Sequence, residues 1–295
     1  MAPAIAPQPC AVSASPQPDL ATAATRHGLP AATRLVYPQP ARRALRNLAA
    51  TIATSPCDTA SGRYDLIRYQ QWRSESSPGE PRTLQEVVRW NAGDLSGAQL
   101  ATRHPPGPAA MTKHWWDRGQ IPSDIPVDPI LDPRQPFVII DRLRHDNDRD
   151  YAAADAVQAI AELVSWHTPR RDERATVLTT LAQYDQLVFY PRVSDRAGRV
   201  GVGIAATVSD DGQRRVLVVD PVTGDVLAYE TARPDEIGAW RPTSYLLVMG
   251  RTRVDARWWE QPGPPPPGRL HPQRARIDLS LPATPCLPVP EGDSR

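Results

Sequence analysis

The sequence predicts an α+β fold in which two antiparallel β-meanders form a curved sheet or half-barrel packed on a central helical pair. Short strand-like segments separated by turns rich in Asp, Gly and Pro predict the meanders. Two amphipathic segments in the middle of the chain predict the helices. Strands and helices do not alternate along the chain, which argues against a doubly wound parallel sheet.

Proline marks the limits of the predicted domain. The 295 residues include 34 prolines, more than twice the usual share of roughly 5%. Residues 1–40 and 261–295 are especially rich in proline, so we expect a disordered or extended N-terminal segment and an extended tail. Residues 41–260 are predicted to form a single α+β domain.

Charge and hydropathy exclude several classes of protein. The 34 basic and 33 acidic residues give a net charge of +1, without the basic excess of a general nucleic-acid binder, so we expect no nucleic-acid partner. No apolar run reaches the roughly 20 residues of a membrane-spanning helix, and the first residues do not resemble a signal peptide. The chain as printed is therefore expected to be soluble, without a transmembrane segment.

The first half of the domain is predicted to contain one helix and a meander. Leu45, Leu48 and Ile52 recur at helical spacing and predict a helix over residues 41–53. Residues 103–136 contain many prolines and little periodicity, and we expect a long loop or insertion there. The predicted strands lie at residues 64–72, 84–90 and 97–102.

The second half is predicted to contain the helical pair and a strand series. Apolar residues from Ala153 to Val164 share one helical face. The second helix is expected to begin at Thr168-Pro169, with threonine as N-cap and proline at the first helical position. The glycines of residues 198–203 lie within a predicted hairpin, so they indicate a tightly curved strand and not a phosphate-binding loop. The predicted strands lie at residues 187–193, 200–208, 215–219, 226–231 and 244–254.

Aromatic residues of the two meanders are the candidate site. Two interpretations remain open for them. They form an ordinary core between the sheet and the helices, or they line an apolar groove for an acyl chain or apolar peptide. The residues are Tyr64, Tyr69, Trp72, Trp90, Phe189 and Tyr190.

No motif of established catalytic chemistry is present. The six histidines do not fall at metal-binding spacings, and the sequence contains no nucleophile elbow or Walker loop. We therefore predict no catalytic, metal-binding or cofactor-binding residue and no cofactor. The three cysteines form no CxxC pair. A Cys57–Cys286 disulfide and three unpaired thiols are the two alternatives.

Several motifs of the domain carry a family resemblance. They include ALRNLAA at 44–50, GRYD at 62–65, Arg89-Trp90, RATVL at 174–178, DRAGRVGV at 195–202 and DPVTGDVLAYE at 220–230. With these motifs the sequence resembles an actinobacterial family of membrane-anchored proteins that are often encoded beside extracytoplasmic-function sigma factors. The resemblance implies an extracytoplasmic domain after a single membrane helix, although the printed sequence holds no such helix. It supplies no catalytic residue.

The order of elements also resembles, more loosely, the half-barrel lipoprotein-carrier fold, in which a curved sheet wraps a helical element around an apolar cavity. Three functions follow as hypotheses. The first is a non-enzymatic, extracytoplasmic-type sensor or binding domain linked to sigma-factor signalling, with a membrane-associated regulatory protein or an apolar small molecule as partner. The second is a carrier of lipid or another hydrophobic ligand. The third is a hydrolase in which His145 or His167 meets a carboxylate only in the fold.

Overall fold

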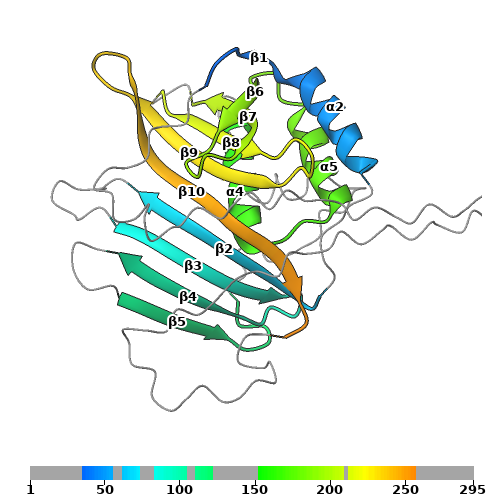
Figure 1. Cartoon of the computed structure of the whole chain (residues 1–295), viewed down its shortest axis with the longest axis vertical. Helices are drawn as coiled ribbons and strands as arrows, with labels where there is room; N and C mark the ends of the chain where they lie inside the picture. The colour runs from blue at the N-terminus through cyan, green and yellow to red at the C-terminus, as the bar shows by residue number, and fades with distance from the viewer. Residues whose placement is uncertain are drawn as a thin grey trace, which may run out of the picture.

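The computed structural model describes residues 35–55, 62–73, 83–104, 110–121, 152–208 and 212–256. These residues form a curved antiparallel sheet with helices packed on one face (Figure 1). The predicted α+β class and antiparallel architecture are therefore confirmed. Both of the predicted meanders belong to the same sheet.

The described part of the chain contributes ten strands to the sheet, and each strand pairs antiparallel with its neighbours. From one edge, the first half comprises β1 (Gln39–Pro40), β6 (Val188–Ser194), β7 (Val200–Thr207), β8 (Arg214–Val219) and β9 (Val226–Pro234). The central strand β10 (Trp240–Val254) follows. The second half continues to the other edge with β2 (Tyr64–Arg73), β3 (Thr83–Ala92), β4 (Gly97–His104) and β5 (Ala110–Trp116).

Strand β10 joins the two halves. Its 15 residues pair with β9 from Trp240 to Leu247 and with β2 from Ser244 to Val254. The register shifts once along each pairing, and such irregularities increase the local twist of a sheet. Figure 1 shows β10 running diagonally between the two halves. The long strand therefore makes one continuous curved surface from two meanders.

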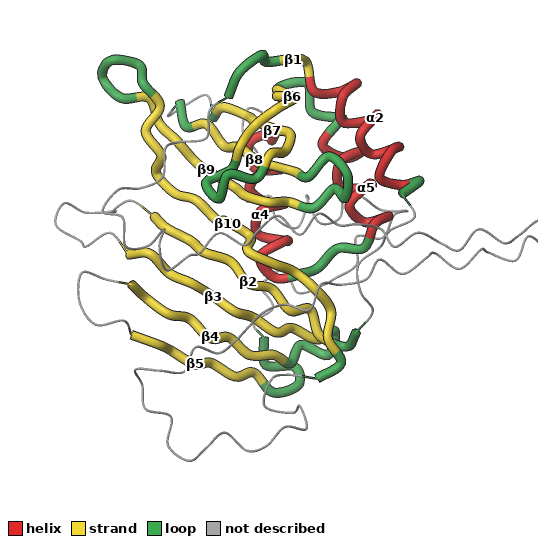
Figure 2. The backbone as a smooth tube through the Cα atoms, in the orientation of Figure 1, coloured by secondary structure: helices red, strands yellow, loops and turns green. Residues whose placement is uncertain are grey.

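Three helices of the described residues, the predicted central pair and the helix predicted at residues 41–53, cover one face of the first half (Figure 2). They are α2 (Ala41–Ala53), α4 (Ala152–Trp166) and α5 (Arg171–Leu181). Helix α4 contacts β7, β8 and β9, and α2 packs on α5. The largest apolar cluster lies between the helices and the sheet and includes Leu45, Ile160, Leu181, Ile204 and Leu217. The amphipathic pattern of each helix thus faces the core.

Two sequence predictions were wrong in detail. The expected loop at 103–136 contains β5, which pairs with β4 along its whole length. The neighbouring prolines concealed a seven-residue segment that itself has none. Helix α5 begins at Arg171, because the Glu173 carboxylate accepts a hydrogen bond from the backbone N–H of Arg170 at 2.5 Å. The Thr168 hydroxyl instead donates to the carbonyl of Thr252. The two-residue strand β1 lies at the end of the N-terminal segment, where it pairs with β6.

Glycines in β7 allow the first half of the sheet to curve tightly. A Cβ atom on Gly201 would lie 2.6 Å from the carbonyl oxygen of Val219 and 3.0 Å from a methyl group of Val218. A Cβ atom on Gly203 would lie 2.8 Å from a methyl group of Val193. Neighbouring backbone and side chains thus occupy the space that larger residues would need, as expected for small residues on a curved strand.

We predict that Gly201→Ala lowers the free energy of unfolding by about 1–3 kcal/mol, because the added methyl group overpacks the site. Gly93→Ala is the matched control, since no atom lies within 4 Å of the added Cβ, and we expect a change within about 0.5 kcal/mol. Urea unfolding of both variants measures the difference. Equal stabilities would contradict the close packing assigned to Gly201.

Candidate functional site

A cleft of about 480 Å³ lies between α4 and the helix-facing side of the sheet. Its walls come from α4, from β2, β9 and β10, and from the residue just before β8. The volume falls within the range of roughly 300–1,000 Å³ that is typical of small-molecule sites. This cleft is the candidate functional site.

Helix α4 supplies one polar wall. Gln158, Glu162 and Ser165 lie on one side of the helix, because their spacing of four and three residues matches the helical repeat. The Gln158 amide donates to the Glu162 carboxylate at 2.8 Å, and the Ser165 hydroxyl donates to the carbonyl of Glu162 at 2.7 Å. These bonds hold the side chains in place at the edge of the cleft.

The sheet supplies the opposite wall. Hydroxyl groups of Thr231 on β9 and of Thr243 and Ser244 on β10 lie side by side, with oxygen–oxygen distances of 2.7 Å from Thr231 to each of the others. On β2, the Gln71 amide donates to Gln85 of the neighbouring strand at 2.5 Å. These oriented hydroxyls and amides retain capacity for further hydrogen bonds.

The charge of the cleft is sparse and balanced. Glu162 on α4 and Arg233 on β9 are the charged side chains among the described lining residues, and both are exposed. Tyr229 and Leu246 add apolar surface. The described lining includes no His or Cys side chain. The arrangement therefore offers many neutral hydrogen-bonding groups, one charge of each sign and a limited apolar area.

Side chains of β3 hold the C-terminal end of α4 on the sheet. Arg89 donates from Nη1 to the carbonyl of Ser165 at 2.8 Å, and Asn91 donates from Nδ2 to the carbonyl of Trp166 at 2.5 Å. The last carbonyls of a helix have no partner within the helix, and a cation near them also interacts favourably with the helix dipole. The two strand side chains thus act as the cap of α4.

Arg89 is buried, and no ion pair joins it to a carboxylate of the described residues. Its guanidinium also donates from Nε and Nη2 to the Gln99 amide oxygen, at 3.1 and 2.7 Å. It lies 3.4 Å from the centre of the Trp166 ring and 5.4 Å from that of Tyr69, within range of cation–π attraction. Burial lowers the pKa of Arg89 to about 10, so the group remains charged at neutral pH.

His167 lies next to this cap and meets a carboxylate. Its Nδ1 is 3.4 Å from Asp65 Oδ2, and Arg253 Nε is 3.0 Å from the other oxygen of Asp65. The side chains of His167 and Asp65 are buried. Neither residue contributes to the lining of the cleft. In the described part of the chain, no group of three His, Cys, Asp or Glu residues is placed to hold a metal ion.

The predicted aromatic residues do not converge on one groove. Trp72 and Tyr190 belong to a cluster on the face opposite the helices, and Trp90 belongs to another cluster of β2–β4. Tyr69 and Phe189 occupy two further clusters. All of the predicted aromatic residues except Tyr190 are buried, Tyr64 among them. Period-two alternation places Phe189 and Tyr190 in different clusters, since neighbours along a strand point to opposite faces.

Other predicted features lie outside the described residues. These include the Cys57–Cys286 pair and His145. The polar residues of the cleft were not predicted, because Gln, Ser and Thr on a strand or on the polar face of a helix usually face solvent. The helical spacing of Gln158, Glu162 and Ser165 was the available signal. None of the described helices has the length and apolar character needed to cross a bilayer.

Comparison with known proteins yields only distant likenesses. The sequence matches no family model and no curated protein. A chain of the Pseudomonas aeruginosa MucA/MucB complex is 14% identical, with a TM-score of 0.33 over 75% of this chain, and the match spans 61% of that chain. The dehydratase domain from the CurK module of curacin polyketide synthase is 11% identical, with a TM-score of 0.15 over 74% of this chain and 83% of that domain. These values carry no functional assignment.

We predict that Arg89→Ala lowers the free energy of unfolding by about 2–3 kcal/mol, because it leaves buried acceptors at the end of α4 without a donor. Arg192→Ala is the control, since Arg192 is exposed on β6. Hydrogen exchange gives the local test, in which the last turn of α4 should exchange faster in the Arg89 variant alone. Unchanged exchange in that turn would contradict the capping role.

Proposed function

We propose that this chain is a non-enzymatic, extracytoplasmic-type sensor or binding domain whose ligand occupies the cleft beside α4. The observation that supports the proposal is the lining of the cleft, where amides and hydroxyls from α4 and three strands face one space. Hydrogen bonds between these side chains orient them before a ligand arrives, which reduces the entropic cost of binding.

The chemistry of the lining favours a peptide segment as the ligand. Glutamine side chains present a donor and an acceptor side by side, as a peptide group does. Gln71, Gln158 and Gln213 therefore match the main chain of an extended peptide. Glu162 and Arg233 add one charge of each sign for side-chain or terminal contacts. The partner is then a segment of a membrane-associated regulatory protein, consistent with the resemblance to a family encoded beside sigma-factor genes.

The two other hypotheses have weaker support. A lipid carrier needs a large apolar cavity, whereas the lining of this cleft is mostly amide and hydroxyl. A hydrolase needs its acid–base pair within reach of substrate. His167 and Asp65 form such a pair, but both are buried under the end of α4 and away from the cleft lining. The cleft therefore supports binding over catalysis.

A mixed-sequence pentapeptide library tests the proposal. The wild-type protein, incubated with the library and separated from unbound peptide, should retain a subset of sequences that mass spectrometry identifies. The double variant Glu162→Gln/Arg233→Gln should bind the retained peptides about tenfold more weakly or worse, because each charge-assisted hydrogen bond contributes roughly 1.5–3 kcal/mol. Both residues are exposed, so the fold should persist.

Arg192→Gln serves as the control, because it removes an exposed charge on β6, outside the cleft lining. It should retain the same peptides as the wild type. Dansylated undecanoic acid provides the apolar comparison and should show no cleft-dependent binding. The proposal fails if no peptide is retained, or if the double variant and the control bind equally. Cleft-dependent binding of the fatty acid would favour the carrier instead.

A further inference from the structure

The turn between β9 and β10 carries the most exposed large apolar side chain of the described residues. Ile237 lies in this turn and is 88% exposed. Trp240, the first residue of β10, is 36% exposed, and the Arg214 guanidinium lies 4.1 Å from the centre of its ring. Figure 1 shows the β9–β10 hairpin reaching one end of the long axis of the molecule. This end therefore holds an apolar side chain in contact with solvent.

Hydrogen bonds hold the turn in one conformation. The Asp235 carboxylate accepts from the backbone N–H groups of Ile237 and Ala239, at 3.1 and 2.8 Å. The carbonyl of Asp235 accepts from Gly238 at 2.9 Å, and its N–H donates to the carbonyl of Ala239 at 2.8 Å. Arg241 donates to the second carboxylate oxygen of Asp235 at 2.8 Å. Ile237 is thus presented by an ordered turn, which reduces the entropic cost of docking it.

The segment before α2 reaches the same end of the molecule (Figure 1). It contains Tyr37, which is 78% exposed and second to Ile237 among the large apolar side chains of the described residues. We call residues 35–46 and 233–241 together the hairpin end. Strands β6, β7 and β8 lie between β1 and β9 in the sheet. Tyr37 and Ile237 are therefore two separate apolar points and not one continuous patch.

The hairpin end carries an excess of positive charge. It contains five arginines, and its acidic residues are Asp235 and Glu236. Three of the arginines are exposed on the first half of α2, where positive charge is unfavourable beside the helix dipole. They therefore do not stabilise this end of the helix. These three are Arg42, Arg43 and Arg46.

We propose that the hairpin end docks on an anionic lipid bilayer, with Ile237 inserted below the headgroups. An apolar side chain at the tip of an ordered element gains free energy among the lipid chains, and cations beside it attract anionic headgroups. Tyrosine and tryptophan favour the boundary between lipid and water, which is the depth that Tyr37 and Trp240 would reach. The arginines then lie at the level of the lipid phosphates.

The arrangement fits a lipid surface better than a protein surface. The core of a protein interface is a close-packed group of neighbouring apolar side chains, whereas the hairpin end offers separate ones. A fluid bilayer has no fixed shape and accepts each inserted side chain where it falls. Arg233 belongs to both the hairpin end and the lining of the cleft, whereas Tyr37 and Ile237 lie outside that lining. Docking therefore involves a surface different from the proposed ligand site.

Co-sedimentation of the full chain with lipid vesicles tests the proposal. The protein should sediment with vesicles of phosphatidylcholine and phosphatidylglycerol and much less with phosphatidylcholine alone. Added salt should weaken the binding, because it screens the attraction between arginines and headgroups. No binding to the anionic vesicles, or equal binding to both compositions, would overturn the proposal. Binding of soluble polyglutamate without binding of vesicles would indicate an acidic protein partner and would also overturn it.

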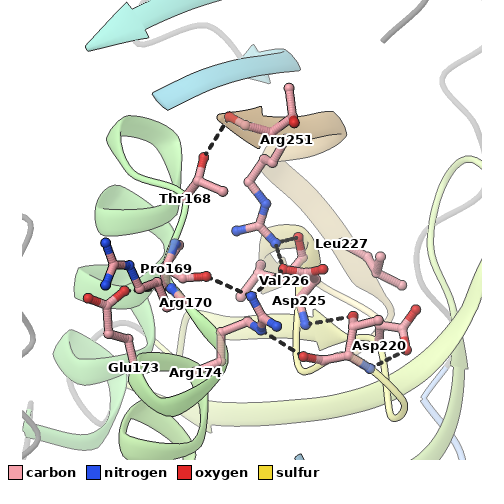
Figure 3. Close-up of polar contacts among 12 residues, drawn as sticks. Thr168, Pro169, Arg170, Glu173, Arg174, Asp220, Asp225, Val226, Leu227 and Arg251 are labelled. Carbon is pink, nitrogen blue, oxygen red and sulfur yellow. Dashed lines mark hydrogen bonds and ion pairs between the residues drawn. The ribbon is translucent and has the colours of Figure 1, made fainter. Parts of the chain in front are cut away.

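A matched pair of variants localises the apolar contact. Ile237→Ser should weaken vesicle binding about tenfold or more, because it removes an aliphatic side chain from the lipid. Val222→Ser is the control, since Val222 is 69% exposed in the β8–β9 turn, where the Asp220 carboxylate accepts from the N–H groups of Val222 and Thr223. Figure 3 shows Asp220 and Asp225 of this turn beside α5. Strand β9 separates the two turns, so the control should bind like the wild type. Equal binding by both variants would show that Ile237 does not insert.

A charge variant tests the contribution of α2. Arg43→Gln/Arg46→Gln replaces two exposed arginines and leaves the Arg42–Asp185 ion pair in place. It should bind anionic vesicles about tenfold more weakly or worse. The urea-unfolding midpoint and the retention of cleft peptides should stay as in the wild type, so a loss of vesicle binding reports neither unfolding nor failure of the cleft. Unchanged vesicle binding by this variant would contradict the docking geometry.

Discussion

The placement of α4 depends on a buried arginine whose charge no carboxylate of the described residues neutralises. Arg89 is held by backbone and amide oxygens and by the faces of two aromatic rings. A lysine could not replace these contacts, since they require the planar, forked guanidinium. At the other end of α4, Asp155 pairs with Arg215 of β8 at 2.8 Å. The helix is therefore fixed to β8 and to β3, with β9, β10 and β2 between them.

This double attachment accounts for the cleft. The segment from Asp155 to Trp166 is about 17 Å long and four strand spacings cover about 19 Å, so α4 spans the intervening strands with the help of the long arginine side chains at its two attachments. Its apolar face packs on β7, β8 and β9. Its polar side then faces β9, β10 and β2 across the cleft, where the strands present mainly hydroxyl and amide side chains. The width of the cleft thus follows from how the helix is anchored and not from a mobile lid.

The sequence located most helices and strands but did not show which side chains lie together in the fold. Turn chemistry and periodicity located α2, α4 and nearly every strand, because these signals are local. The prolines around β5 predicted a loop, although the segment between them pairs with β4. Thr168-Pro169 predicted the start of a helix, although the Thr168 hydroxyl instead donates to the carbonyl of Thr252. The aromatic residues were grouped by type, although Phe189 and Tyr190 are adjacent on one strand and must point to opposite faces. The cleft itself brings together residues from α4 and three strands, and no local pattern reveals such an assembly.

The proposed ligand site is the space between α4 and the strands β9, β10 and β2. Amide chemical-shift mapping with a peptide retained from the library is the direct test of this site. Shifts are expected to concentrate on the second half of α4, around Gln158–Ser165, and on the residues around Thr231 and Ser244. Shifts confined to β5 or to the face opposite the helices would contradict it.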